Sequence, residues 1–372
     1  MALRMTATIL AAGCVAACSV GPTLSTGSAQ RASAASAARA AANDSYLYAA
    51  DCCGVLNAGD VTVYPAGATK GVRRVIRGAH FPMALAMDSR DTLYVLNESA
   101  AGPEGIAVTE YDRGEKTPAR RIGYFYWATT LALDRSDELY VANCNTCVYS
   151  GASHHADSER RDSIMIYAAR STTLLRTITQ GVHQPSSLAF DSSGNLYVVN
   201  QKIKHKRGSV TVYAPASGSP SRTITLGLTD PQLATLDASD DLFVTNEGRQ
   251  VLEYASGSDE PARTIGTGIA TPDALTTDAS GTLYVANPNW FDSEVQWISV
   301  YPAGSSSPNY EIKEGIDAPV ALALDRNQNL FVANIGGKYG KITVYPAGAR
   351  KPSLVIPSGP YGEPRALTFG RH

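Results

Sequence analysis

The sequence has almost no excess of either charge. Lys and Arg number 32, Asp and Glu number 34, and the formal net charge is −2. Nucleic-acid-binding domains carry a basic patch or stripe, so this balance argues against nucleic acid as the main partner. Charged residues make up only 18% of the chain and hydrophobic residues 44%, proportions that suit a folded globular protein.

The sequence also lacks an apolar run long enough to span a bilayer. The run Met5–Ala17 has 13 residues, fewer than the roughly 20 that a membrane helix needs. Because it follows the basic residue Arg4, it is typical of a signal peptide. Val15-Ala16-Ala17-Cys18 then resembles a bacterial lipobox, which implies a lipid on Cys18. We therefore expect a signal peptide with a lipobox over residues 1–18.

Two alternatives to this anchor stay open. Leu10 to Cys14 is a weaker second lipobox, and an ordinary signal peptide cut near Ala17 would release the protein. Ser19 after the cysteine resembles the pattern of Gram-negative outer-membrane lipoproteins. The expected location is therefore the cell envelope, at the outer membrane or on the periplasmic face, with secretion if the lipobox is not used.

Residues 19–43 contain almost no large side chain, being mainly Ser, Ala, Gly and Thr. Such a segment cannot bury enough apolar surface to offset its ordering entropy. We expect a flexible tether, with a short, loose helix as the alternative because alanine is frequent. The folded domain is then expected over residues 44–372.

A five-residue pattern, Leu283-Tyr284-Val285-Ala286-Asn287 in one copy, occurs seven times in this domain. Its copies begin at Leu47, Leu93, Leu139, Leu196, Leu242, Leu283 and Leu330, at spacings of 41 to 57 residues. An apolar-x-apolar-Tyr pattern follows each copy and ends at Tyr64, Tyr111, Tyr167, Tyr213, Tyr254, Tyr301 and Tyr345. A period of this length indicates a repeat architecture.

Both patterns are typical of strands, since they are short, rich in β-branched and aromatic residues and bounded by turn residues. Alternate residues of a strand point to opposite faces, and here both faces are apolar. Sheets stacked radially cover both faces. The sequence therefore predicts an all-β, seven-bladed propeller with four antiparallel strands per blade. A strand at Arg365–Phe369 should complete the first blade, which begins at Tyr46–Asp51, and so close the ring.

The segment Pro185 to Asn200 reads Pro-x-x-Leu-Ala-x-Asp-x-x-Gly-Asn-Leu-Tyr-Val-x-Asn. It resembles the NHL repeat and its bacterial propeller relatives. That resemblance implies either a protein-interaction propeller or an enzyme like the metal-dependent gluconolactonases and the streptogramin lyases. NHL repeats usually end in Asp, where this chain has Asn six times and Asp51 once. We expect these seven residues to cap turns and backbone rather than bind a ligand.

Four consecutive aromatic residues mark one expected loop, Gly123 to Trp127. Aromatic rings with polar tips suit sugars, peptides or apolar ligands, so Tyr124, Tyr126 and Trp127 are candidate ligand-binding residues. The alternative is that they pack beneath the adjacent long loop. Trp290 and Phe291 could likewise bind a ligand or pack within the fold, and packing is favoured.

The mouth of the central channel offers further candidates. The residues expected there, one per blade, are Met83, Thr129, Ser186, Gln232, Asp273, Val320 and Arg365. Asp273 and Arg365 are charged and Gln232 is polar, so we assign these three to ligand binding. The lactonase-like enzymes hold a metal with several acids and amides, and this mouth has one acid. We expect no metal, cofactor or catalytic residue; Glu98 and Glu247 are the nearest additional acids.

Cysteine and basic residues complete the candidates. Cys144 and Cys147 are expected to form a disulfide in an exported protein, and a zinc site with His154 and His155 is the weaker alternative. Cys52 and Cys53 are adjacent, so a bridge between them would be strained. The basic segment Gln201 to Gly208 is expected to be a solvated loop, or to contact an anionic ligand.

The function that the sequence favours is a monomeric binding module for a protein, peptide or glycan, attached to the membrane only by its lipid. A lactonase or lyase acting at the channel mouth is the main alternative, and a structural spacer without a ligand is the third. Clustering of the aromatic residues with the mouth residues would favour binding. Three or more converging carboxylate or amide oxygens would favour the enzyme.

Overall fold

The computed structural model describes residues 45–52, 59–65, 74–76, 78–97, 106–147, 161–203, 206–247, 249–289, 295–337, 340–358 and 362–371. The expected signal peptide (1–18) with Cys18 and the expected tether (19–43) lie outside these residues. Among the described residues, no helix is long and apolar enough to cross a membrane.

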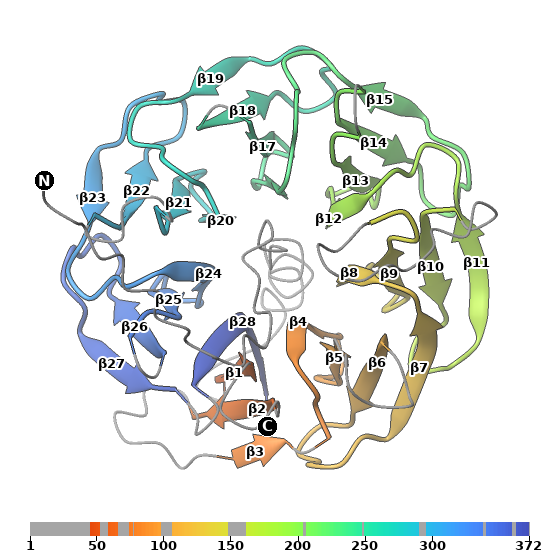
Figure 1. Ribbon diagram of the computed structural model, residues 1–372. Coiled ribbons are helices and arrows are strands. Elements are labelled where there is room, and N and C mark those ends of the chain that lie inside the picture. Colours follow the sequence, from red (N-terminus) through yellow and green to blue (C-terminus); the bar gives the residue numbers. More distant parts are fainter. Residues whose placement is uncertain are drawn as a thin grey trace, which may run out of the picture.

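The described chain forms seven four-stranded antiparallel sheets arranged as blades around a central axis (Figure 1). Blade 1 contains β28 (Glu363–Arg371), β1 (Ser45–Cys52), β2 (Asp60–Tyr64) and β3 (Arg74–Ile76). Blade 2 contains β4 (Pro82–Met87), β5 (Leu93–Asn97), β6 (Ile106–Tyr111) and β7 (Arg120–Phe125). Blade 3 contains β8 (Ala128–Leu133), β9 (Leu139–Asn143), β10 (Ser163–Tyr167) and β11 (Leu174–Ile178). Blade 4 contains β12 (Pro185–Phe190), β13 (Leu196–Asn200), β14 (Ser209–Tyr213) and β15 (Arg222–Ile224).

The remaining blades have the same order. Blade 5 contains β16 (Ala234–Leu236), β17 (Leu242–Asn246), β18 (Gln250–Tyr254) and β19 (Arg263–Ile265). Blade 6 contains β20 (Ala274–Thr277), β21 (Leu283–Asn287), β22 (Trp297–Tyr301) and β23 (Tyr310–Ile312). Blade 7 contains β24 (Pro319–Leu324), β25 (Leu330–Asn334), β26 (Lys341–Tyr345) and β27 (Leu354–Pro357). The predicted seven-bladed, all-β architecture is confirmed.

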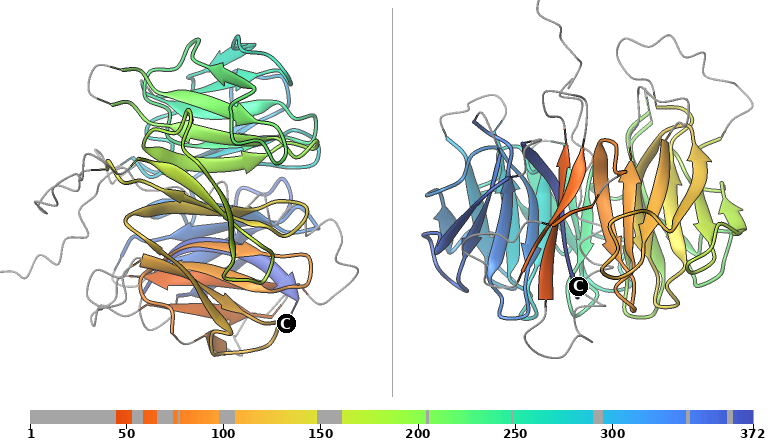
Figure 2. Two further views of the ribbon diagram at one scale, coloured as in Figure 1. Left: turned by 90° about the vertical axis from the view of Figure 1, so that its right-hand side faces the viewer. Right: turned by 90° about the horizontal axis from the view of Figure 1, so that it is seen from below.

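In each blade we name the strands A to D from the axis outward. Strands A line the centre of the ring and strands D its rim (Figure 1), and the ring is a disc when seen edge-on (Figure 2). Strands B carry the five-residue pattern, and β5, β9, β13, β17 and β21 are buried at every residue. Their two apolar faces pack against the neighbouring blades, as in the cluster that joins Tyr94 of blade 2 to Val141 of blade 3.

The ring closes through pairing of the last strand with the first. β28 pairs with β1 antiparallel from Ser45↔Arg371 to Cys52↔Glu363. The closing strand is longer than the predicted Arg365–Phe369, because this pairing runs the full length of β1. Arg371 extends the closure to blade 2, where its backbone N–H and Nε donate to the two carboxylate oxygens of Asp91 at 2.9 and 2.7 Å.

The Asn at the end of strand B joins two parts of the chain through its amide group. In blade 7 the Asn334 Oδ1 accepts the Asp317 N–H at 2.8 Å, and its Nδ2 donates to Thr343 Oγ1 at 3.0 Å. The other Asn residues accept backbone N–H groups in the same way, from His80, Tyr126 and Trp127, His183, Thr229 and Asp230, and Ala270. The expectation that the repeat residues cap backbone is confirmed for these six Asn, whereas Asp51 of blade 1 accepts a hydrogen bond from the Thr62 hydroxyl at 2.5 Å.

The turns between strands A and B are held by one carboxylate each. The first Asp of each turn accepts two backbone N–H groups of the same turn: Asp88, Asp134, Asp191, Asp237, Asp278 and Asp325. Two of these turns also bind the next blade. Ser89 donates from N and Oγ to Asp137 at 2.9 and 2.5 Å, and Ser192 makes the same pair of bonds to Asp240.

Deletion of residues 360–372 should unfold or aggregate the protein, because it removes β28 and exposes the edge of β1. Thermal melting and size-exclusion chromatography measure this outcome. As a control, Arg371→Ala removes only the side-chain contact with Asp91 and should cost about 1 kcal/mol or less. An unchanged melting temperature after the deletion would contradict the closure.

Asn334→Ala should lower the free energy of unfolding by about 2 to 4 kcal/mol, because buried donors and acceptors lose their partners. Asn334 is fully buried, whereas Asn327 in the adjacent A–B turn is exposed. Urea unfolding should therefore show a change within about 0.5 kcal/mol for Asn327→Ala. Equal effects of the two variants would show that the amide does not hold the loop.

Candidate functional site

The two faces of the disc differ in what their polar groups do. Connections from B to C and from D to the next A emerge on one face, which we call the loop face. Connections from A to B and from C to D emerge on the other, the turn face. On the turn face the first carboxylate of each of the six A–B turns is engaged with its own backbone. The loop face is therefore the better place to expect binding groups.

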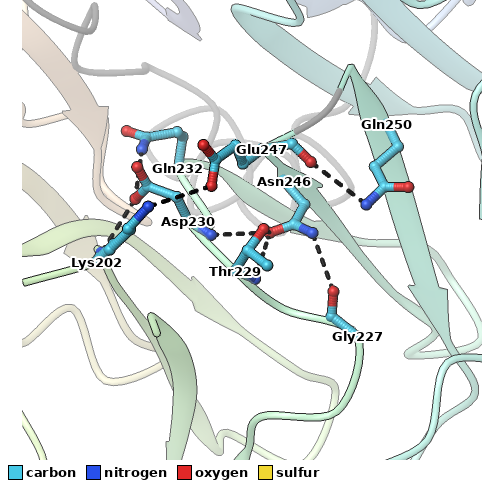
Figure 3. Close-up of polar contacts among 8 residues, drawn as sticks. All are labelled: Lys202, Gly227, Thr229, Asp230, Gln232, Asn246, Glu247 and Gln250. Atoms are coloured by element: carbon cyan, nitrogen blue, oxygen red, sulfur yellow. Dashed lines mark hydrogen bonds and ion pairs between the residues drawn. The ribbon is translucent and has the colours of Figure 1, made fainter. Parts of the chain in front are cut away.

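A group of polar side chains gathers on the loop face where blades 4 and 5 meet (Figure 3). Lys202 follows strand B of blade 4, and Glu247 follows strand B of blade 5; their Nζ and Oε2 atoms are 3.5 Å apart. Asp230 Oδ1 accepts the Lys202 N–H at 3.0 Å and Gln232 Nε2 at 3.1 Å. The Gln232 and Gln201 amides are also hydrogen-bonded. We call these five residues the blade 4–5 cluster.

The repeat Asn of blade 5 positions this cluster. Asn246 Oδ1 accepts the N–H groups of Thr229 and Asp230 at 2.9 and 3.1 Å, which holds the loop between β15 and β16 (Figure 3). Glu247 comes directly after Asn246, and its carbonyl accepts Gln250 Nε2 at 3.4 Å. The cluster therefore lies on a backbone that the fold has already ordered, as binding residues on loops require.

The ion pair in the cluster is exposed to solvent. The Lys202 and Glu247 side chains are 42% and 56% exposed. Surface pairs of this kind contribute only about 0 to 1 kcal/mol to stability. A partner can therefore exchange this pair for contacts of its own at little cost to the fold.

At the centre of the ring, the predicted residues Asp273 and Arg365 lie close enough to interact electrostatically. Asp273 is only 7% exposed, and its Oδ2 has no hydrogen-bond partner within the described residues. Burial raises the pKa of the Asp273 carboxyl well above its usual range, and the Arg365 charge opposes this shift. Arg365 Nη2 donates to Glu363 Oε2 at 2.7 Å, so the guanidinium already has an anionic partner.

Two other predicted mouth residues connect blades. Thr129 Oγ1 donates to the Pro185 carbonyl at 2.6 Å, and Ser186 Oγ donates to the Gln232 carbonyl at 2.8 Å. Each bond runs from strand A of one blade to the backbone at the start of the next. These hydroxyl groups therefore stabilise the ring, whereas Gln232 places its side chain in the blade 4–5 cluster.

The aromatic segment is divided among different environments. The prediction of a loop over Gly123–Trp127 is wrong in part, because β7 continues to Phe125, which pairs with Ile106 and is 3% exposed. Tyr124 points outward and is 69% exposed. Trp127 is half-buried against the core cluster between blades 2 and 3. Tyr126 and Trp127 connect β7 to β8, so the four aromatic residues are divided between a strand and the connection that follows it.

The cysteines of blade 3 are bonded to each other. A disulfide joins Cys144 and Cys147, whose Cα atoms lie 5.5 Å apart. Asp162 organises the same region, since its two oxygens accept the N–H groups of Asn145, Thr146 and Gln184 at 2.7 to 2.8 Å. Asp162 belongs to no repeated pattern, so the sequence does not mark it as a structural residue.

The alternative zinc and enzyme sites involve residues outside the described ranges. His154 and His155 of the zinc alternative lie there, as does Glu98 of the enzyme alternative. The aromatic residues Trp290 and Phe291 also lie outside these ranges. Cys52 is disulfide-bonded, and Cys53 lies outside the described residues too. In the part of the chain that the structure describes, no three His, Cys, Asp or Glu side chains are arranged to hold a metal ion.

No family model and no curated protein matches this chain. Among solved structures it is similar to the WD40 β-propeller domain of Doa1, with 10% sequence identity and a TM-score of 0.56. The match covers 79% of this chain and 87% of that one. At this identity the likeness shows the propeller fold alone.

Asp273→Asn should make the protein more stable at neutral pH. A carboxyl whose folded-state pKa is raised contributes stability that is present below its unfolded pKa and lost as the pH rises toward the folded pKa. The stability gained by the variant should therefore grow as the pH rises above about 4, the ordinary range of an Asp carboxyl. Urea unfolding between pH 4 and pH 8 measures it. A variant that becomes relatively less stable with rising pH would show that attraction to Arg365 outweighs burial.

Proposed function

We propose that this chain is an exported, lipid-anchored propeller that binds a protein, peptide or glycan partner through its loop face. One observation carries the proposal: the blade 4–5 cluster presents an exposed ion pair and two amides on an ordered backbone beside the channel mouth. Charged and polar groups of this kind set partner choice and association rate. Tyr124 adds exposed aromatic area at blade 2.

The contrast between the faces supports this choice of surface. The turn face repeats one short Asp turn, and the first carboxylate of that turn bonds to its own backbone in six blades. The connections that vary in length and composition emerge on the loop face. A rigid scaffold that varies mainly at one set of loops is the arrangement in which binding sites are found.

The sequence pattern supports membership among NHL-like propellers, since Pro185 to Asn200 resembles that repeat over its whole length. The Asn in place of the usual Asp is accommodated, because both oxygen and nitrogen of the amide are used in blades 4 and 7. We take the protein-interaction members of that group, rather than its enzymes, as the better guide to this chain.

The anchor in this proposal is Cys18, within the lipobox-like Val15-Ala16-Ala17-Cys18. The 25 residues from 19 to 43 would join the lipid to the disc. As a flexible chain, that segment would have an end-to-end distance of roughly 25 to 30 Å. The proposed location is the periplasmic face or the outer membrane, where the tether lets the loop face reach a partner.

A photocrosslinking amino acid at Glu247 should give a specific adduct in intact cells, because this position lies in the proposed binding surface. The matched control is Asp259, which lies in the C–D turn of the same blade on the turn face. The two side chains are 56% and 53% exposed. Denaturing electrophoresis followed by mass spectrometry identifies the adducts.

Lys202→Glu, combined with the crosslinker at Glu247, should weaken the adduct by reversing a charge in the surface. The adduct should also fall with increasing salt, since exposed charges are screened. Adducts at Asp259 but not at Glu247, or equal adducts at both, would contradict the loop face as the binding surface.

A further inference from the structure

The boundary between blades 5 and 6 on the turn face contains a pocket of about 180 Å³. Its walls come from the A–B turns of both blades, from strands B, C and D of blade 5 and from the C–D turn of blade 6. Four charged side chains line it: Asp237, Asp241, Glu253 and Arg263. We call it the seam pocket. It lies on the opposite face from the blade 4–5 cluster, so a ligand bound in it would be independent of the proposed function.

The residues at this boundary differ from those at most other boundaries. The residue of strand A that pairs with the first Leu of strand B faces the preceding blade. In six blades it is large and apolar: Met87, Leu133, Phe190, Leu236, Leu324 and Phe369. Blade 6 has Thr277 there. The second residue of strand B is Tyr in five blades and Phe in two, Phe243 of blade 5 and Phe331 of blade 7. Phe243 lines the pocket without a hydroxyl group.

The serine–aspartate bonds that join the A–B turns at two other boundaries are replaced here. At the boundary of blades 2 and 3, Ser89 donates twice to Asp137. The corresponding residues at the boundary of blades 5 and 6 are Ala238 and Gly281, which both line the pocket. Neither has a polar side chain, so the two turns are not joined in this way.

Blade 2 provides an internal comparison, because it carries the same Glu–Arg ion pair between strands C and D. Glu110 pairs with Arg120 there, as Glu253 pairs with Arg263 in blade 5. In blade 2, however, the Tyr94 hydroxyl accepts the backbone N–H of Arg170 at 3.2 Å, across the boundary to blade 3. The residue equivalent to Arg170 in blade 6 is Gly304. A Cβ atom on Gly304 would lie 3.5 Å from Arg263 Nη1.

The charge of the pocket indicates the class of ligand. Three carboxylates and one guanidinium give a formal charge of −2, in a recess walled by Phe243, Ala279 and Ala303. No three acidic, His or Cys side chains in the described ranges are arranged to hold a metal ion. The carboxylates therefore suit a ligand whose positively charged N–H donors are separated from each other. We infer that the seam pocket binds a small aliphatic diammonium compound, which bridges blades 5 and 6 where their A–B turns have no serine–aspartate bond.

The test is a calorimetric titration of the purified full-length chain with 1,4-diaminobutane at low ionic strength, with 1,4-butanediol as the neutral compound of the same length. We expect saturable binding of the diamine and none of the diol. Phe243→Tyr, which places a hydroxyl group in the pocket as in blade 2, should abolish binding. The melting temperature of this variant without ligand shows whether it is folded.

A second pair of variants separates the pocket from general surface charge. Asp241→Asn keeps the oxygen that accepts the Ser256 N–H at 2.8 Å but removes one charge, and should weaken diamine binding about fivefold, the equivalent of roughly 1 kcal/mol. Asp259→Asn makes the same change at an exposed residue outside the pocket and should leave binding unchanged. Absence of saturable binding, or equal weakening by both variants, would overturn the assignment.

Discussion

The structure depends on the buried amide at the end of strand B. Strands B are apolar on both faces, so each must lie between two neighbours, but packing alone does not set how the chain passes from one blade to the next. The Asn does this, since Asn334 holds the incoming loop at Asp317 and strand C at Thr343 together. In six blades the Asn oxygen accepts backbone N–H groups of the incoming loop, which gives these blades the same entry geometry.

This constraint also places the variable residues. The amide oxygen is occupied by backbone in six blades, and the amide nitrogen bonds to strand C in blades 2, 4, 6 and 7. The repeat Asn is therefore not available to a ligand. The residues just after it are the first that the fold leaves undetermined. Gln201 and Lys202 follow Asn200, and Glu247 follows Asn246. The blade 4–5 cluster therefore lies just after the repeat Asn residues, on backbone that their hydrogen bonds hold in place.

The period, the strands and the closure could be predicted because each is repeated or follows from a repeat. The contacts of the cluster could not, since Lys202 and Glu247 are far apart in the sequence and meet only through the loop conformations. The aromatic segment shows another limit. A register irregularity between Ile106 and Val108 lets β7 continue to Phe125, and one-residue shifts of this kind leave no pattern in the sequence.

Residues that depart from the repeat mark the boundary between blades 5 and 6 as different from the others. In a repeat protein each unit contacts mainly its neighbours, so the cost of an unfilled position stays at one boundary. Thr277 and Phe243 leave blades 5 and 6 less tightly filled, while Leu275, Leu283 and Val285 still form a shared core with Phe243. Because the β28–β1 pairing closes the ring elsewhere, this boundary can keep a charged recess and remain folded. A ligand that bridges this boundary would then connect two A–B turns that have no serine–aspartate bond between them.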